Sequence, residues 1–415
     1  MKKRLIIAFT LLLPLLSFAG DKAKFGIKFS GFVKTDIFND SRQTVWVREG
    51  HLLLFPKNVS LDANNNDINS KSNFNMLSIQ TRLKGAITGP DVLGAKTSGV
   101  IEGAFFGHTN ADINGFRLRH AFAKLRWENS ELLVGQYWHA MFITENFPGV
   151  VSFNTGIPFQ PFSRNPQVRF TQYAENFKFV FTAMSERDFA STGPLGGTST
   201  YLRNANIPEL NFTMHYNANL GEGSKLLLGA GANYLNLLPR LTTDDGYITN
   251  ERVEGISFMG FAKLTTKDIT WKIESVFGQN NNNLLMLGGY APKLGSSPFD
   301  ADGDYAYTPS KVSSFWTELH TNGKKWQTGI FLGYTKNNGY KDQIATTSIM
   351  YTRGGNIDYV YRVAPRVMYN EGKMRFALEL EHTTAAYGTT HTDGTVIDSE
   401  EVNNLRVLFA VYYFF

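Results

Sequence analysis

The amino-acid sequence predicts an all-β protein: a transmembrane antiparallel up-and-down β-barrel of about 16 strands, with its third long loop folded inward. Three observations lead to this fold class. Segments of alternating apolar and polar residues recur along the chain, the connectors between them are short and long in turn, and the last segment is apolar and ends on Phe415. Such a strand would promote aggregation at the end of a soluble chain, whereas in a closed barrel both of its edges are paired.

The alternating segments number about sixteen, and an even count is typical of single-chain bacterial barrels. No convincing stretch with the period of a helix interrupts them. The expected strands lie at 25–39, 74–89, 97–108, 116–128, 131–137, 166–174, 177–185, 209–219, 225–237, 252–266, 269–279, 312–321, 325–336, 358–369, 373–387 and 402–415.

The connectors alternate in length. Short ones such as 129–130 and 370–372 join two strands into a pair, and long ones join each pair to the next. An even strand number places both chain ends on the side of the short turns. This asymmetry is typical of outer-membrane barrels, which have short periplasmic turns and long external loops. The long connectors are 40–73, 138–165, 186–207, 238–251, 280–311, 338–357 and 388–401.

The amino terminus has the pattern of a secretory signal peptide. A basic start at 2–4 precedes an apolar stretch at 5–16, and Ala19 is a suitable cleavage residue. We therefore expect a signal peptide at 1–19 and a single barrel domain at 20–415. The alternative is a membrane anchor, although the apolar stretch is short for a span.

Composition excludes several classes of function. The expected signal peptide holds three of the 41 Lys and Arg residues and no acid, which leaves 38 basic and 36 acidic residues. This near balance is unlike that of a bulk nucleic-acid binder. The chain contains no cysteine, so disulfides and thiolate metal sites are excluded.

The two faces of the strands indicate a wet interior. In 373–387, Met374, Phe376 and Leu378 alternate with Lys373 and Arg375. A soluble barrel would bury its apolar face inside. Apolar residues outside and charged residues inside instead predict an aqueous lumen in a barrel surrounded by lipid.

The connector 138–165 is the candidate constriction loop. It is unusually apolar for an external loop, with Phe142, Phe147 and three prolines, and it also carries Glu145 and Arg164. A loop folded into the lumen and packed on the inner wall would bury these rings. The alternative is a loop that packs under a subunit contact or caps the barrel.

Cationic residues of the inward phase come from the first four and the last three strands, which are neighbours once the barrel closes. We expect a basic stripe on one wall, with Glu145 as the opposing negative charge and a transverse field that sorts solutes by charge. The alternative is that many of them pair with acids such as Asp36, Glu102, Glu379 and Glu381. The candidates are Lys28, Lys34, Arg82, Lys84, Arg117, Arg119, Arg362, Arg366, Arg375 and Arg406.

The strand 116–128 has an internal conflict. Arg117 and Arg119 share one phase, whereas Lys124 and Arg126 share the other. A β-bulge near Ala121, or a periplasmic end beyond the bilayer, would reconcile them.

Metal and catalytic patterns are sparse. Asp300, Asp302 and Asp304 alternate as in a calcium loop but lack the later bidentate Glu, so a solvated turn is the preferred interpretation. The histidines show no metal spacing, and no Ser–His or paired-acid site is persuasive. We therefore expect no cofactor and no enzymatic activity.

Short motifs resemble a known family. The segment Ser30-Gly31-Phe32-Val33-Lys34-Thr35-Asp36 resembles the first strand of DcaP-type porins, which are related to phosphate-selective-type porins. The segments 117–122 and 133–138 resemble the fourth and fifth strands of that family, ahead of its constriction loop. The resemblance spans roughly the first 170 residues. It implies a homotrimer of sixteen-stranded channels for small, often anionic solutes. The last strand is also similar to the Phe-ending strands that the barrel assembly machinery of bacteria reads.

Taken together, these observations predict a porin in the bacterial outer membrane, which passively admits small hydrophilic solutes with a mild anion preference. The expected partners are outer-membrane lipid and lipopolysaccharide, the assembly machinery through Phe415, and further copies of the chain in a homotrimer. Nucleic acid is not expected. Two alternatives stay open: a substrate-specific uptake channel for phosphate or dicarboxylates, and a non-conducting surface or adhesin barrel.

Overall fold

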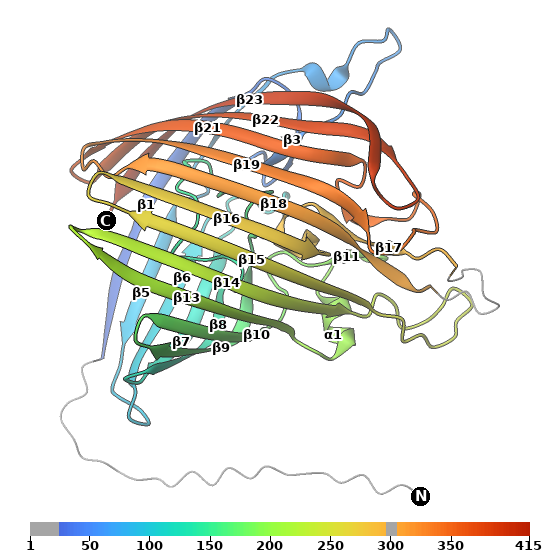
Figure 1. Cartoon of the computed structure of the whole chain (residues 1–415). Coiled ribbons are helices and arrows are strands. Elements are labelled where there is room, and N and C mark those ends of the chain that lie inside the picture. The colour runs from blue at the N-terminus through green and yellow to red at the C-terminus, as the bar shows by residue number, and fades with distance from the viewer. Residues whose placement is uncertain (1–24, 296–304) are drawn as a thin grey trace, which may run out of the picture.

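The computed structural model of the chain describes residues 25–295 and 305–415. The expected signal peptide and the motif of Asp300, Asp302 and Asp304 lie outside the described residues. Sixteen antiparallel strands form one closed barrel, which confirms the predicted fold class (Figure 1). The strands tilt across the barrel, with short turns on one side and long connectors on the other (Figure 1).

Every predicted strand is present. The second barrel strand is divided into two parts, β4 and β5, which both pair with β1. The barrel strands are β1 (Gly26–Asp40), β4 (Asn73–Leu77) with β5 (Arg82–Thr88), β6 (Lys96–Ala104), β7 (Arg117–Arg126), β8 (Ser130–Trp138), β9 (Arg164–Ala174), β10 (Phe177–Met184), β13 (Glu209–Gly221), β14 (Ser224–Leu237), β15 (Val253–Thr265), β16 (Ile269–Gln279), β18 (Tyr307–Thr321), β19 (Trp326–Tyr340), β21 (Ile357–Glu371), β22 (Met374–Thr390) and β23 (Val396–Phe414).

The remaining elements are short and belong to the long connectors. None of the helices in the described part of the chain is long and apolar enough to cross a membrane. These elements are β2 (Thr44–Val47), β3 (Leu52–Pro56), η1 (Ile68–Ser70), β11 (Thr192–Gly193), β12 (Gly196–Gly197), α1 (Thr200–Ala205), η2 (Asn282–Leu284), β17 (Gly288–Pro292) and β20 (Tyr351–Arg353).

The last strand closes the barrel against the first. β23 pairs antiparallel with β1, from Phe32 opposite Phe414 to Asp40 opposite Arg406. Gly31 exchanges backbone hydrogen bonds of 3.2 Å with Phe415. A Cβ at Gly31 would lie 2.1 Å from the carbonyl oxygen of Arg82, so this close approach requires glycine. The apolar chain end is therefore fully paired in the sheet.

The distribution of side chains is the reverse of that in a soluble barrel. Large apolar residues such as Phe181, Phe258 and Phe277 are more than half exposed on the outer wall. Charged residues of the opposite phase, among them Glu318 and Glu379, are fully buried inside. Such a distribution suits a barrel whose outer wall faces lipid.

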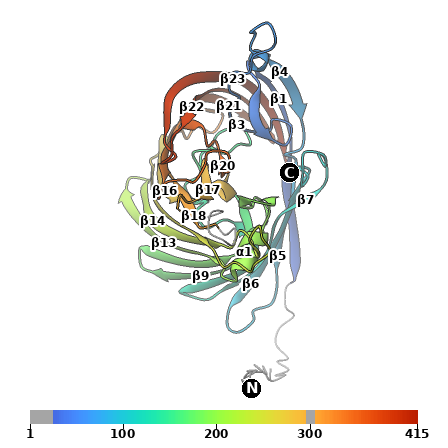
Figure 2. The ribbon, with the colours of Figure 1, turned by 90° about the vertical axis from the view of Figure 1, so that its right-hand side faces the viewer.

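The first long connector departs from expectation. The sequence predicted a long external connector over 40–73, but β2 and β3 form a hairpin whose residues Leu52–Pro56 are buried among inner-wall strands β22 and β23. Only its later part, 57–72, projects from the barrel as an exposed arm (Figures 1 and 2). The apolar run at 52–55 explains the difference, because it loses contact with water by packing on Phe38 and Phe153.

Candidate pore and constriction

The loop between β8 and β9 lies inside the barrel, as its apolar composition predicted. Phe142, Phe153, Phe159 and Phe162 are each less than 5% exposed and pack against inner-wall residues such as Trp316. Phe147 is 40% exposed and lies 5.5 Å from Phe142, centre to centre. The loop therefore narrows the lumen by packing its rings on the wall.

Three wall carboxylates fix the path of this loop. Glu379 accepts hydrogen bonds from the backbone N–H groups of Val151 and Ser152, at 2.7 and 2.8 Å. Glu318 accepts one from the backbone N–H of Gly149 at 2.8 Å, and Glu381 accepts one from the Asn154 side chain at 2.6 Å. We name Glu318, Glu379 and Glu381 the carboxylate anchor. Because a buried N–H without an acceptor is costly, these carboxylates hold the loop against the wall by satisfying its donors.

Cations of the same wall balance the anchor and also bind the loop. Lys34 donates to the carbonyl oxygen of Val151, and Arg362 donates to that of Ile157, both at 2.8 Å. Arg366 forms an ion pair with Glu318. These cations hold the loop and its carboxylates, so they contribute structure more than free positive charge.

Two more cations of this wall also pair with acids, which is the alternative to a free basic stripe. Lys34 contacts Asp36 at 2.9 Å, and Arg406 contacts Asp40 across the closing seam at 2.6 Å. The expectation of one continuous basic stripe from β21 to β1 is therefore not met there, because an acid faces each of these cations.

The adjacent wall has an excess of cations. Arg82 and Arg119 share Glu102, at 3.5 and 2.7 Å. Arg117 and Arg164 share Asp188, and the Arg164 contact measures 2.7 Å. We name Arg82, Arg117, Arg119 and Arg164 the arginine ladder. Four guanidinium groups here contact two carboxylates.

An aromatic platform joins the two halves of the ladder. Trp138 lies 4.9 Å from the guanidinium of Arg164 and 5.8 Å from that of Arg119. The Trp138 ring stacks on Phe142 of the constriction loop, with 3.9 Å between ring centres. Cation–π contact orients both guanidinium groups beside the loop. The ladder therefore runs along the constriction.

A β-bulge in β7 places Arg119 there. The pairing of β6 with β7 passes from Glu102 opposite His120 to Gly103 opposite Leu118, which leaves Arg119 as the extra residue. Arg119 and His120 are both buried inside. The sequence offered two explanations for the conflict of phase in this strand, and the β-bulge is the one found. It lies at Arg119, two residues before Ala121. Lys124, beyond it, reaches Glu131 at 3.0 Å.

Glu145 lies against the wall formed by β10 and β13, and β10 pairs directly with β9 of the arginine ladder. It also shares a pocket with Lys124 of β7 and Arg169 of β9, so it does not face the basic wall across the lumen as the sequence predicted. It forms an ion pair of 2.6 Å with Lys178 of β10 and a contact of 3.1 Å with His215 of β13. Burial alone raises the pKa of Glu145, but the hydrogen bond with His215 and the charge of Lys178 outweigh it and lower the pKa to about 2. Glu145 is therefore ionised at neutral pH and faces cations of its own wall.

Three other predicted cations lie away from the loop. Lys28 is exposed, Lys84 is half-buried, and Arg375 donates a hydrogen bond of 2.8 Å to Asn370 beside a short turn. Among residues 25–295 and 305–415, none of these three forms an ion pair with an acid. The structure thus brings together Arg82, Arg117, Arg119 and Arg164 but does not add Lys28, Lys84 or Arg375 to them.

Sequence reasoning missed an outer cavity of about 420 Å³ on the side of the long connectors. Arg48, Arg187 and Arg353 line it, together with His108 and Asp188. The Arg48 side chain is held by the backbone carbonyl oxygens of Gly107 and His108. These residues come from separate connectors, so their spacing in the sequence gave no signal. We name this cavity the arginine vestibule.

Comparison with known proteins supports the architecture. No family model and no curated protein matches the chain. Among solved structures, the outer membrane channel DcaP of Acinetobacter baumannii superposes with a TM-score of 0.68 at 16% identity, over 94% of this chain and 97% of that one. The chain has the fold of this channel.

Two further solved structures are similar. The anion-selective porin from Comamonas acidovorans has a TM-score of 0.55 at 10% identity, over 94% of this chain and 100% of that one. OmpT of Vibrio cholerae has a TM-score of 0.52 at 11% identity, over 94% and 98%. The likeness to these two proteins concerns the fold, and the roles of the pore residues follow from the contacts in this chain.

In the part of the chain that the structure describes, the His, Asp and Glu residues form no cluster that could hold a metal ion. The sequence motif of Asp300, Asp302 and Asp304 is outside that part. The buried carboxylates of the barrel instead bind the loop and the arginines.

Proposed function

We propose that the mature chain is an outer-membrane porin, a passive diffusion channel for small hydrophilic solutes with a mild anion preference. The arginine ladder carries the proposal. Because Arg82, Arg117, Arg119 and Arg164 exceed their carboxylate partners, the wall beside the constriction attracts anions and repels cations. The apolar outer wall and the fold shared with outer-membrane channels support the location.

Planar-bilayer recordings test this function. Purified wild-type protein should give long-lived open steps, and its reversal potential in a salt gradient should have the sign of an anion-preferring pore. The double variant Arg117→Ala with Arg119→Ala should move the reversal potential toward zero. Arg375→Ala, a cation beside a short turn, is the matched control and should leave it unchanged. Folded protein that never conducts would refute the channel, and an unchanged ion preference would remove the two arginines from the mechanism.

We also propose a homotrimer. One OmpT structure from Vibrio cholerae is of a trimer form. In this chain, outward residues of β1, β5 and β6 such as Phe29, Leu83 and Ile101 are exposed and apolar, and the arm at 57–72 leads into β4, which pairs with the other end of β1. Conductance steps that occur in groups of three, with a matching mass in detergent, would support the trimer. A monomeric mass with single steps would contradict it.

The biogenesis of the barrel follows from the same proposal. Residues 1–19 direct export, and the paired strand ending in Phe415 is recognised by the assembly machinery of the outer membrane. The folded protein then contacts lipid and lipopolysaccharide and performs no enzymatic reaction. Secretion of a fusion carrying residues 1–19, with cleavage after Ala19, tests the first step.

A second candidate function is a substrate-specific uptake channel for phosphate or dicarboxylates. The arginine vestibule favours it, because guanidinium groups match the oxygens of both anions. Millimolar phosphate or succinate should then interrupt chloride current through wild-type channels, and Arg187→Gln should weaken the interruption. Equal currents with and without these anions would exclude the substrate-specific channel and favour the general diffusion pore.

A non-conducting barrel is the third candidate. The inward β2–β3 hairpin, the constriction loop and the buried segment Gly288–Pro292 all occupy the interior (Figure 2). The bilayer recordings decide between this candidate and the channel.

A further inference from the structure

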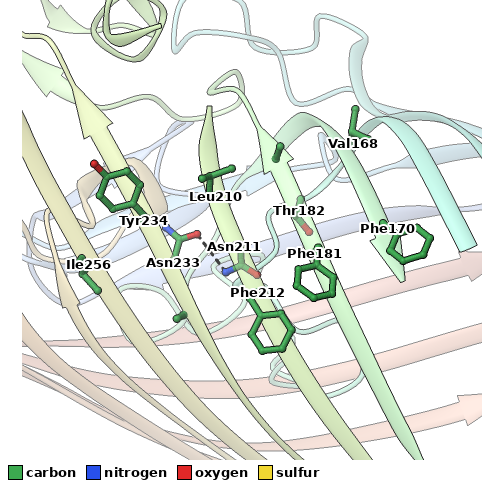
Figure 3. A pocket seen from close by; sticks show the side chains of 12 residues that line it. Val168, Phe170, Phe181, Thr182, Leu210, Asn211, Phe212, Asn233, Tyr234 and Ile256 are labelled. Atoms are coloured by element: carbon green, nitrogen blue, oxygen red, sulfur yellow. Dashed lines mark hydrogen bonds between the residues drawn. The ribbon is translucent and has the colours of Figure 1, made fainter. Parts of the chain in front are cut away.

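The outer wall carries an apolar groove across five neighbouring strands. Phe170, Phe181 and Phe212, from β9, β10 and β13, stand opposite one another in register and form its lower border. The rings of Phe181 and Phe212 lie 4.8 Å apart, and Figure 3 shows both pointing away from the strands. The groove has a volume of about 550 Å³, and its twelve lining residues include no charged one.

A small residue creates the hollow. Ala183 lies directly between Val168 and Leu210 in the pairing of the strands, one row nearer the long connectors than the three phenylalanines. Its methyl group leaves space that a larger side chain would fill. Ala183 and Val168 also line a second hollow of about 610 Å³, so the two hollows adjoin each other at these residues.

The second hollow leads to a cation at the rim of the barrel. Leu202 and Arg203 of α1 line it, and Arg203 is the charged residue among its thirteen lining residues. The Arg203 side chain is exposed, and its contact within the described residues is a hydrogen bond of 3.0 Å to the hydroxyl of Thr200. The apolar groove on the outer wall thus ends at the guanidinium group of Arg203, which has no acidic partner in the described chain.

This combination matches one kind of ligand. An acyl chain fits an apolar groove that faces lipid, and a guanidinium at the membrane surface pairs with phosphate oxygens in a fork geometry. We propose that the groove from Phe181 to Arg203 is a binding site for a phosphorylated, acylated lipid of the outer leaflet, whose acyl chain lies over Ala183 and whose phosphate pairs with Arg203. The inference rests on the proposed membrane location but not on conduction.

Native mass spectrometry of the detergent-purified full-length protein tests the site, with lipid A and dephosphorylated lipid A as probes. Wild-type protein should retain lipid A through delipidation and retain the dephosphorylated form about tenfold less, since a charge-assisted pair of ordinary strength is lost. Arg203→Gln should lower lipid A retention to the level of the dephosphorylated lipid and leave the latter unchanged.

A matched pair of substitutions tests the groove itself. Ala183→Phe fills the hollow and should abolish retention of both lipids. Ala230→Phe, on the exposed outer face of β14 and outside both hollows, should retain them as wild type does. Heat-modifiable gel migration verifies that each variant is folded. Equal retention by the two phenylalanine variants, or equal binding of the two lipids by wild type, would overturn the proposal.

The same samples separate this site from the channel. Both phenylalanine variants and Arg203→Gln should conduct as wild type does, because the groove lies outside the lumen. Wild-type protein that retains lipid A but never conducts would refute the proposed porin and keep the lipid site. Protein that conducts but binds both lipids equally would refute the lipid site and keep the proposed porin.

Discussion

Glu379 of β22 accepts the backbone N–H of Val151 at 2.7 Å, although the two residues are 228 positions apart in the sequence. Its second carboxylate oxygen accepts the N–H of Ser152. One fully buried side chain of the inner wall therefore holds two successive residues of the constriction loop. A buried acceptor that satisfies two backbone donors is costly to replace, because the donors then lack partners.

Replacement of this residue should release the loop. Glu379→Gln substitutes an N–H₂ group for one acceptor oxygen and leaves a backbone donor unpaired, at a cost of about 1–3 kcal/mol to the packed loop. We expect noisier open-channel current and faster cleavage within 139–163 by added protease. Glu401→Gln, an exposed acid on the neighbouring β23, is the control. Identical noise in both variants would show that the anchor does not hold the loop.

Arg82 offers the mildest test of the arginine ladder. Its side chain is 23% exposed, so Arg82→Gln disturbs folding less than changes at the buried Arg119 or Arg164. Removing one positive charge should reduce the anion preference by part of the effect of the double variant. The measurement is the reversal potential in a salt gradient, with Arg375→Gln as the control. A shift toward stronger anion preference would contradict the role of the ladder.

Glu145 should act in the opposite direction. Its folded pKa of about 2 lies below the ordinary value of 4.5, so the ionised form contributes stability above pH 4.5 that is lost as pH falls toward 2. Glu145→Gln leaves Lys178 without its partner and should increase the anion preference at neutral pH. Wild-type channels should approach the variant as pH falls toward 2. Glu254→Gln on the outer side of β15 controls for a general loss of charge, and equal reversal potentials for the two variants would exclude Glu145.

Glu186 predicts a pH dependence in the connector before α1. Burial, followed by the charge of Glu209, raises the pKa of Glu186 to about 8. The folded connector therefore binds a proton that the unfolded chain releases near pH 4.5, and its stability declines as pH rises from about 4.5 through 8. Hydrogen exchange across 186–199, corrected for the intrinsic pH effect, should show weaker protection at pH 9 than at pH 6.

The variant Glu186→Gln isolates this effect. A carboxamide does not titrate, so protection should no longer change with pH over that interval. The hydroxyl of Ser191, which lies 2.6 Å from the carboxylate, can still donate to the amide oxygen. Persistent pH dependence in the variant would assign the effect to another group.

Most of the barrel could be predicted from the sequence. Alternation with a period of two depends only on which face of a strand meets lipid or water, and that information is local. The strand count, the short and long connectors and the closing position of 402–415 followed from it, and the structure confirms them. The constriction loop was also recognisable, because its rings have no reason to lie in water.

The partners of the charged residues could not be predicted. Asp188 reaches Arg117 and Arg164, and Glu318 reaches Arg366 and Lys272, only after the barrel has closed. The bulge at Arg119 was expected as one of two possibilities, but pairing with β6 decided it. Likewise the apolar run at 52–55 is visible in the sequence, yet its place inside the lumen depends on space left by other connectors.

The sequence by itself thus determined the membrane-facing sheet, since strand order and face follow from local periodicity. Only the tertiary structure decided which cations remain in excess. A buried charge is compensated by whatever residue the fold brings within a few ångströms, and those neighbours come from distant strands and loops. The same reason applies on the outer wall, where the space over Ala183 exists only because Val168 and Leu210 flank it in register.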